Sequence, residues 1–509
     1  MTNPAQGVPF RIYNTLGREI QEFRPEDPEL VRMYTCGPTV YAYAHLGNMR
    51  AYVCADLLRR ALEWKGYGVC QLMNITDVGH MTSDDDLSVA VGEDKLEAAS
   101  RREGRTVWDV AEHYTWAFQR DLGLLNIQPP SLWAKATDHI PEMIEFAKRL
   151  QGQRVAYEIP SGLYFDVSTV PNYGRLALLD TEGLREGARV SVAEGKRNPR
   201  DFALWRRSAP DSNRLMEWES PWGPGVPGWH LECSVMSIKY LGEHFDVHTG
   251  GIDHVPIHHT NEIAQSEAFL DDGRPWVRYW FHNEFLVLGD AKVSKSRGDT
   301  IRLGTLAEEG FPASVYRYFL LNTHYRSPAT FSMSALASAR TALGRLIERL
   351  QPADGPTLEC TYAEAYGELA GSPGLRYLLQ LDTAISDDLN TAQALAVLHA
   401  VSHDECLTET DVAALVGAAQ RLLGLDLSGT SLGEMKTELR LEDIPEEVRL
   451  LLDEREAARA RRDFVRADAI RDEIARMGLT VEDTSEGPRL VRHASRRDWA
   501  RQHSPAPPG

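Results

Sequence analysis

A chain of 509 residues is too long for one hydrophobic core, so two to four domains are expected. Its composition is 43% hydrophobic and 25% charged, and no apolar run approaches the about 20 residues that a membrane-spanning helix needs. The first nine residues show no signal peptide, and six scattered cysteines do not make a disulfide framework. We therefore expect a cytoplasmic protein without a membrane contact.

The charge is distributed unevenly along the chain. The net charge of −19 argues against a nucleic-acid partner at first, but such binding depends on local patches. From Leu451 onward the net charge is +1, whereas the first 450 residues carry −20. The C-terminal segment is therefore relatively basic. It is either a nucleic-acid contact or a solvated helix with many ion pairs, and charge alone does not separate these interpretations.

The first recognisable unit combines two strands with a helix between them. Residues 33–41 are β-rich, and apolar residues then recur at helical spacing from Met49 to Leu62, with Gly66 ending the helix. A second strand is expected over 69–75. Strand, helix and strand in this order predict a βαβ unit and a parallel sheet.

A second sheet-like region follows after an interruption. A strand is expected over 244–248, closed by Gly250-Gly251, and a helix is expected over 261–270. The intervening stretch contains a predicted helix over 140–150 and a strand over 162–167. We interpret this stretch as an inserted domain.

The pattern becomes helical after Phe331. Five leucine and isoleucine residues between 336 and 350 share one face, and one long helix is expected over 375–399. Residues 428–436 are typical of a linker, and the proline-rich residues 504–509 are typical of a disordered tail.

His45-Leu-Gly-Asn48 lies where the first strand turns into the helix. Backbone N–H groups at a helix N-terminus, together with the helix dipole, favour phosphate. We expect His45 and Asn48 to serve catalysis at the phosphates and Gly47 to let the adenine or ribose approach the backbone. Such a string is also common in plain turns, so alone it decides little.

Lys292-Val-Ser-Lys-Ser296 forms a second, basic string. Two lysines three residues apart suit a loop that neutralises departing pyrophosphate, so Lys292 and Lys295 are candidate catalytic residues and, with Ser294 and Ser296, candidate nucleotide contacts. The alternative is a solvated basic loop. In this order around a parallel-sheet pattern, the two strings resemble the HIGH and KMSKS signatures of class I aminoacyl-tRNA synthetases, with Asn48 replacing the last histidine.

Histidines crowd into one segment of the chain, since six of the 16 lie within 230–259. Cys233 lies in the same segment, and His258 and Glu262 are spaced i, i+4, which places them on one helix face. Cys36 ends the first strand. Two thiolates, an imidazole and a carboxylate form a tetrahedral set that Zn²⁺ accepts, so a metal site is predicted.

Two alternatives remain at this site. His259 competes with His258 as ligand, because spacing alone does not separate an i, i+3 pair from an i, i+4 pair. Cys36 and Cys233 are equally the kind of small residue that is often buried as a hydrophobe.

Several longer strings carry a closer resemblance: Cys36-Gly-Pro-Thr-Val-Tyr, Asn74-Ile-Thr-Asp77, Lys196-Arg-Asn-Pro, Asp201-Phe-Ala-Leu-Trp205, Gly228-Trp-His-Leu-Glu-Cys233, His258-His-Thr-Asn-Glu-Ile-Ala-Gln265 and His324-Tyr-Arg-Ser327. From about Met33 to Arg492 the chain resembles the cysteinyl-tRNA synthetase family. The resemblance implies an enzyme that activates L-cysteine with ATP and Mg²⁺ and transfers it to tRNA-Cys. It also implies one Zn²⁺ per chain, with the ligands Cys36, Cys233, His258 and Glu262.

The resemblance assigns further residues by position. The cysteine pocket of the family falls on Gly37, Thr39, Thr76, Trp229 and His248. Beyond His45 and Gly47, the ATP contacts include Gly250 and Asp253, the latter at the ribose. The chain departs from the family pattern at Ala42 and from Gly79 to Leu96, which puts details of the acceptor or ATP contacts in doubt rather than the reaction.

An Arg-rich helix expected over 455–477 resembles the anticodon-reading module of the family. We expect Arg459 to hold phosphate, Phe464 to stack on an unpaired base, and Asp468 and Asp483 to accept from base amino groups. The alternative is that Phe464 belongs to the hydrophobic core.

The expected fold class is α/β. A Rossmann-like parallel-sheet catalytic domain is split by an insertion and followed by a helical bundle and a small anticodon-binding domain. The expected divisions are the N-terminal half of the catalytic domain (1–128), the inserted connective domain (129–220), the C-terminal half (221–282), the region of the KMSKS loop (283–341), the bundle (342–430) and the anticodon-binding domain (437–503).

Two rival functions remain, and the chain is expected to be a monomer. The nearer rival is a cysteine ligase that uses an amino-sugar acceptor, against which the Arg-rich C-terminal segment argues. The other is an inactive, zinc-binding paralogue, against which the intact His45, Lys292 and Lys295 argue.

Overall fold

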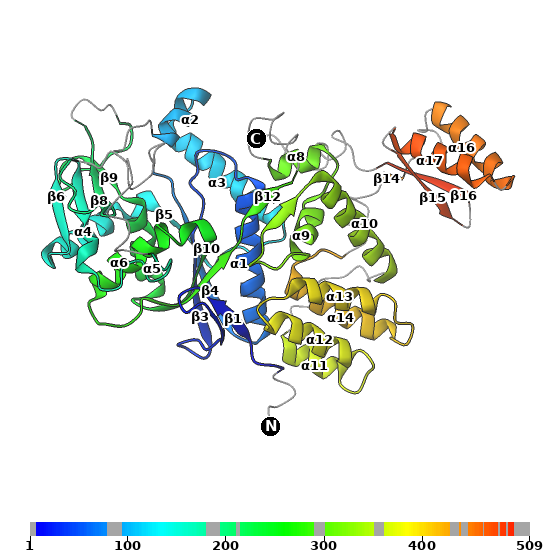
Figure 1. Ribbon diagram of the computed structural model, residues 1–509, viewed down its shortest axis with the longest axis horizontal. Helices are drawn as coiled ribbons and strands as arrows, with labels where there is room; N and C mark the ends of the chain where they lie inside the picture. Colours follow the sequence, from blue (N-terminus) through cyan, green and yellow to red (C-terminus); the bar gives the residue numbers. More distant parts are fainter. Residues whose placement is uncertain are drawn as a thin grey trace, which may run out of the picture.

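The computed structural model describes residues 7–78, 94–179, 194–209, 214–289, 301–350, 361–427, 437–438, 446–461, 463–476, 479–484 and 487–492. A five-stranded sheet occupies the middle of the larger part of the molecule (Figure 1). All neighbouring strands in it are parallel, in the order β11 (Val277–Asn283), β10 (Phe245–Gly251), β3 (Leu30–Thr35), β4 (Gly68–Ile75) and β5 (Leu132–Lys135).

Both faces of this sheet are covered, because successive side chains of its strands are buried in opposite directions. Met33 packs in the core that contains α1 (Leu46–Trp64), and the next residue, Tyr34, packs in the core that contains α4 (Ile140–Gly152), α5 (Trp229–Leu241) and α6 (His258–Leu270). A parallel sheet buried on both faces requires apolar residues at nearly every strand position. The expected βαβ unit is confirmed by β3, α1 and β4.

The strand order reverses between β3 and β10. From β3 the chain runs through α1 to β4 and β5 on one side, whereas β10 and β11 add to the other side of β3. In open α/β sheets, ligands bind outside the carboxyl ends of the strands at such a switch point. Cys36 follows β3 there, and the short helix η5 (Ile252–His254) follows β10.

An antiparallel sheet interrupts the chain between β5 and α5, as expected for an insertion. Its strands are β6 (Ala156–Ile159), β7 (Gly162–Phe165), β8 (Phe202–Arg207) and β9 (Gly225–Pro227). Buried Asp201 accepts hydrogen bonds from Tyr157 Oη (2.5 Å), Asn198 N (2.9 Å) and Val167 N (3.0 Å). It thereby fixes the turn that precedes β8.

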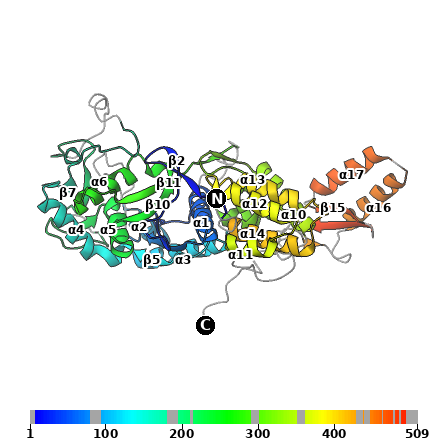
Figure 2. The same ribbon diagram turned by 90° about the horizontal axis from the view of Figure 1, so that it is seen from below.

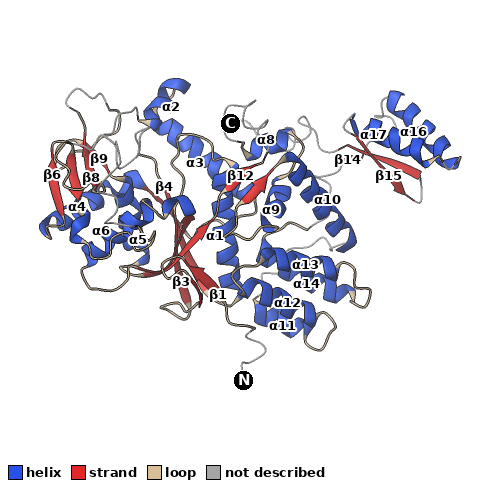
Figure 3. Cartoon of the chain, in the orientation of Figure 1, coloured by secondary structure: helices blue, strands red, loops and turns tan. Residues whose placement is uncertain are grey.

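The remaining helices follow β11. A parallel pair, β12 (Leu286–Leu288) and β13 (Ala329–Phe331), brackets α8 (Leu303–Glu308) and α9 (Ala313–Leu321), while α2 (Lys95–Glu103), α3 (Val107–Leu124) and the hairpin β1 (Arg11–Asn14) and β2 (Glu19–Glu22) lie earlier in the chain. The bundle, seen as the group of helices in Figure 3, comprises α10 (Met333–Leu350), α11 (Tyr362–Leu369), α12 (Leu375–Ser386), α13 (Thr391–Val401) and α14 (Glu409–Leu423).

The single helix expected over 375–399 is wrong. It is divided into α12 and α13, because Asp388 and Leu389 adopt left-handed backbone angles (φ 56° and 57°). The carboxylate of Asp388 accepts hydrogen bonds from Tyr13 N (2.8 Å), Tyr325 Oη (2.6 Å) and Arg326 Nε (2.6 Å). These tertiary contacts stabilise the break between α12 and α13, where local helix propensity alone would continue the helix.

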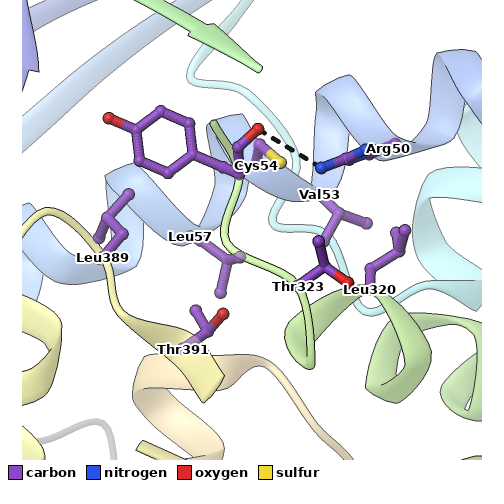
Figure 4. A pocket seen from close by; sticks show the side chains of 9 residues that line it. Arg50, Val53, Cys54, Leu57, Leu320, Thr323, Leu389 and Thr391 are labelled. Atoms are coloured by element: carbon purple, nitrogen blue, oxygen red, sulfur yellow. Dashed lines mark hydrogen bonds between the residues drawn. The ribbon is translucent and has the colours of Figure 1, made fainter. Parts of the chain in front are cut away.

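Helix α1 is tied to the helical part through buried charges. Asp56 forms ion pairs with Arg60 (2.7 Å) and with Arg317 of α9. Figure 4 shows a small cavity beside Arg50, whose guanidinium donates to the backbone carbonyl of Tyr325 (3.4 Å) and to those of neighbouring turns. The N-terminal end of α1 is therefore fixed by contacts well outside the sheet.

A separate C-terminal module projects from the bundle in both ribbon views (Figures 1 and 2). It contains α16 (Glu446–Ala460), α17 (Phe464–Arg476) and a sheet of β14 (Thr437–Glu438), β16 (Gly487–Arg492) and β15 (Leu479–Thr484). The single helix expected over 455–477 is wrong, since Asp463 Oδ1 accepts from Arg466 N (3.1 Å) at the start of a second helix. The predicted linker and tail, 428–436 and 504–509, lie outside the described residues. Among the described residues, no helix combines the length and apolar character needed to cross a bilayer.

Candidate active site

The N-terminus of α1 presents one histidine at the switch point. His45 is the N-cap of this helix, and its Nδ1 accepts a hydrogen bond from Asn48 N (3.2 Å) while Asn48 Oδ1 accepts from His45 N (3.1 Å). A side chain at Gly47 would press on the His45 ring, at 2.9 Å from its Cε1. Because Nδ1 accepts, the proton of a neutral His45 lies on Nε2, where it can donate to an anionic ligand.

Two residues at the switch point, His45 at the start of α1 and Asp253 after β10, lie close enough to interact electrostatically. Burial lowers the pKa of His45, and the Asp253 carboxylate nearby opposes this shift. Asp253 lies in η5 directly after β10, and Gly250 near the end of β10 leaves room for His254 and His259, since a Cβ there would meet His259 Cε1 at 2.6 Å. Lys292, Ser294, Lys295 and Ser296 lie outside the described residues.

A second group of side chains gathers where β3, α5 and α6 meet. One donor atom each from Cys36, Cys233, His258 and Glu262 lies within 4.8 Å of the others, and all four residues are buried. His258 Nε2 lies 3.5 Å from Cys233 Sγ and 2.7 Å from Glu262 Oε1. The helix α6 begins at His258, three residues earlier than expected, so the i, i+4 spacing falls within one helix.

The group fits a metal ion by two independent observations. A tetrahedral zinc site with usual bond lengths separates a sulfur from a nitrogen ligand by about 3.5 Å, which matches the distance from Cys233 to His258. The two oxygens of the fully buried Glu262 lie 2.7 Å from His258 Nε2 and 2.8 Å from His248 Nε2, but neither contact has the geometry of a hydrogen bond, and no other described residue supplies one. A cation held by the carboxylate would satisfy it.

A second set of donors overlaps the first. Cys36, His248, His259 and Glu262 also lie within 4.8 Å, with His259 Nε2 3.5 Å from Cys36 Sγ and His248 Nε2 2.8 Å from Glu262 Oε2. Both neighbouring histidines therefore reach the site. His258 faces two of the donors, a thiol and a carboxylate, whereas His259 faces the Cys36 thiol.

Electrostatics within this group favour a bound cation. Burial raises the pKa of the Cys36 thiol, and a hydrogen bond with Cys36 together with burial raises the pKa of Cys233 well above its usual value. Burial lowers the pKa of His258, but Glu262 and Cys233 outweigh it and raise that pKa to about 10. The two thiols therefore need a neighbouring cation to become thiolates.

The predicted cysteine pocket lies against the metal group. Gly37 N donates to Asn74 Oδ1 (2.7 Å), Thr39 pairs with Thr76 in a parallel bridge, and Thr76 Oγ1 donates to Glu232 Oε2 (3.1 Å). Trp229 and His248 are the other two residues of the predicted cysteine pocket. The Trp229 ring stacks on His258 with centroids 4.1 Å apart, and His248 is fully buried against Trp280.

Sequence reasoning missed two residues at this pocket. Asn74 accepts from Gly37 N and from Tyr34 Oη (3.1 Å) and donates to Thr76 Oγ1 (3.0 Å), so its amide joins β3 to β4. Buried Glu232 receives the Thr76 hydroxyl. Both residues stood inside the strings that carried the family resemblance, and for Asn74 the available signal was a polar residue in an apolar strand.

The residues expected to contact tRNA are not brought to this site but lie on the C-terminal module. Arg459 and Asp468 are exposed on α16 and α17, and Asp468 Oδ1 lies 3.1 Å from Arg471 Nη2. Phe464 is 60% exposed, so the interpretation of this residue as core is wrong. Asp483 lies on β15.

Comparison with known proteins identifies first the class and then the family. The parallel sheet and the His45 helix are those of a class I aminoacyl-tRNA synthetase, since residues 22–341 match the family model described as tRNA synthetases class I (C) catalytic domain. Similar folds include methionyl-tRNA synthetase of Mycobacterium tuberculosis (TM-score 0.51, 16% identity, 77% of this chain and 89% of that chain) and LeuRS in a tRNA complex from Agrobacterium radiobacter (TM-score 0.53, 12% identity, 81% and 86%).

The family is narrower than the class. Residues 441–488 match the cysteinyl-tRNA ligase anticodon binding domain. Curated cysteine–tRNA ligases of Novosphingobium aromaticivorans and Thermus thermophilus are 46% and 42% identical over 490 and 498 residues, each covering 94% of this chain and 96% and 98% of the relative. The chain belongs to the cysteine–tRNA ligase family, and the expected α/β fold and family are confirmed.

Proposed function

We propose that this chain activates L-cysteine with ATP and transfers it to the 3′ end of tRNA-Cys, with one zinc ion selecting the thiol. As a member of the cysteine–tRNA ligase family it is an ATP-dependent aminoacyl-tRNA ligase. The observation that carries the zinc proposal is the buried set of Cys36, Cys233, His258 and Glu262 at the switch point, beside the helix capped by His45.

The chemistry of the donor set suits cysteine as substrate. When bound, zinc supplies a soft Lewis acid that holds a thiolate far better than the hydroxyl of serine. Gly37, Thr39, Thr76, Trp229 and His248 are proposed to surround the rest of the amino acid. Because an apolar pocket alone rejects a near-isostere by only about 100-fold, selection by the metal removes the need for an editing site.

ATP is proposed to lie across the switch point with Mg²⁺. His45 Nε2–H would donate to the phosphate oxygens, and Gly47 and Gly250 would allow the nucleotide to approach the backbone. Asp253 would bind the ribose. Lys292 and Lys295, with Ser294 and Ser296, are proposed to meet the charge that develops on the departing pyrophosphate.

The C-terminal module is proposed to read the tRNA. Arg459 is suited to a phosphate, the exposed Phe464 to stacking on an unpaired base, and Asp468 and Asp483 to base amino groups. The match of this module to an anticodon-binding family argues against the amino-sugar ligase, which needs no such arm. The retained donor set and His45 argue against an inactive paralogue. A cytoplasmic monomer is also proposed.

Three assays on the full-length protein test this function. Metal analysis should give one zinc per chain, and exchange of pyrophosphate into ATP should depend on cysteine and not on serine. Bulk tRNA should then accept cysteine. Exchange with cysteine but charging of an amino-sugar in place of tRNA would make the rival correct, and a protein that binds zinc without exchange would be an inactive paralogue.

A further inference from the structure

The second ring nitrogen of His258 begins a buried hydrogen-bond chain. Nε2 of His258 faces Cys233 and Glu262, while its Nδ1 lies 2.9 Å from His230 Nδ1 on α5. Behind it, His230 Nε2 lies 3.1 Å from Asn261 Nδ2, and Asn261 Oδ1 accepts from Tyr173 Oη (2.6 Å). His230, His258 and Asn261 are all less than 5% exposed.

The hydrogen bonds of this buried chain of side chains can run in two opposite directions, here called senses. Each sense places the His258 proton on a different ring nitrogen. With Asn261 Nδ2 donating to His230 Nε2, His230 carries its proton on Nδ1 and donates it to His258 Nδ1, which leaves the proton of a neutral His258 on Nε2. With the Asn261 amide turned over, Oδ1 accepts from His230 Nε2–H, and His258 Nδ1–H donates to His230. The two amide orientations have the same shape, so the heavy atoms stay in place, and only the Tyr173 hydroxyl hydrogen has to turn, because Tyr173 Oη then accepts from Asn261 Nδ2.

Only the second sense suits a metal ligand. A histidine binds a metal through a ring nitrogen without a proton, and its other N–H must then find an acceptor. We propose that His230 and Asn261 are positioning residues that hold the His258 proton on Nδ1 and leave Nε2 open for zinc. The inference rests on the proposed function, because it concerns the same metal site.

The neighbouring histidine has a matching chain, which provides a control. His259 Nδ1 lies 2.7 Å from His282 Nε2, and His282 Nδ1 lies 2.8 Å from Thr15 Oγ1. His230 and His282 are therefore equivalent buried partners, each behind one of the two candidate ligands. A change at His230 should weaken the metal site, whereas the same change at His282 should not.

The test measures zinc affinity of the full-length protein by competition with a chromophoric chelator, independently of activity. His230→Leu should raise the zinc dissociation constant by about 10- to 100-fold, the range for a lost outer partner of a metal ligand. His230→Gln, whose amide oxygen can accept from His258 Nδ1–H, should stay close to the wild type. Thermal unfolding after zinc removal should be similar for Gln and Leu, which separates positioning from packing.

A variant of Asn261 tests the sense of the hydrogen-bond chain. Asn261→Asp provides only acceptors, so it keeps the sense that suits zinc and should retain the metal. If that variant releases zinc, the chain runs the other way and the proposal is wrong. It is also wrong if His282→Leu weakens zinc while His230→Leu does not, because His259 is then the ligand. A wild-type protein that binds no zinc would instead overturn the metal in the proposed function.

Discussion

Replacing Gly37 by alanine tests whether the pocket depends on close contact between two backbone segments. Gly37 directly follows Cys36, and a Cβ at this position would lie 1.6 Å from Asn74 O and 2.7 Å from Asn74 C. Ordinary contacts begin at 3.4 Å, and both partners are backbone atoms that cannot rotate away. The segment after β3 must therefore move away from β4 by roughly 2 Å.

The expected loss of activity follows from the contacts and residues that this shift displaces. The hydrogen bond from Gly37 N to Asn74 Oδ1 (2.7 Å) breaks, at about 1 kcal/mol. Cys36 and Thr39 move with the segment, and a misplacement of about 1 Å at reacting groups costs about 100-fold in rate. We expect Gly37→Ala to lower kcat/KM for cysteine in pyrophosphate exchange by about 100-fold, or about 2.7 kcal/mol.

A matched glycine provides the control. Gly123 lies in α3, and a Cβ there meets nothing within 4 Å. Gly123→Ala should keep full exchange activity and gain at most about 1 kcal/mol of stability. Both variants are assayed after circular dichroism shows that they are folded. A folded Gly37→Ala protein with wild-type kcat/KM would refute the reasoning, because the pocket would then tolerate separation of the two segments.

Three further changes have distinct expected outcomes. Cys233→Ser should lose zinc by metal analysis and weaken cysteine binding, and cysteine affinity kept without metal would contradict selection by the metal. Asp56→Asn should cost about 3–5 kcal/mol in urea unfolding, because it leaves two buried arginines unpaired, whereas Glu22→Gln in an exposed pair should cost less than about 1 kcal/mol. Burial raises the pKa of the Asp56 carboxyl, but Arg60 and Arg317 outweigh burial and lower this pKa below its usual value. The carboxylate therefore stabilises the fold at neutral pH, and this stabilisation is lost in acid as the pH falls through the lowered pKa. Deletion from Thr437 should leave pyrophosphate exchange unchanged, strongly reduce tRNA charging and make tRNA binding less dependent on salt. An equal loss of both activities would contradict a separate tRNA arm.

The elements near the switch point were predictable because their pattern is local. Apolar residues from Met49 to Leu62 recur at helical spacing, and α1 follows them. The break at Asp388 was not predictable, because it depends on hydrogen bonds from Tyr13 and Tyr325, which are far away in the chain. Local propensity alone continues the helix through this point.

The candidate site divides in the same way. The gathering of Cys36, Cys233 and Glu262 could be predicted from residue types and a family resemblance, and the structure brings these donors together. The role of Asn74 could not, because it depends on how β4 aligns with the segment after β3. The choice between His258 and its neighbour depends on the exact start of α6 and on the buried partners of each ring, which no spacing rule contains.

The split of the sheet by an insertion also dictates when the metal site can exist during synthesis. Cys36 precedes the insertion, whereas the other three proposed ligands follow it on α5 and α6. A nascent chain that has emerged only as far as the inserted domain contains a single proposed ligand and cannot form the four-ligand zinc site. Two fragments cut within the insertion would likewise each lack a complete donor set. Zinc retention by mixed fragments would therefore report that the two halves of the sheet have reassembled across the β3–β10 pairing.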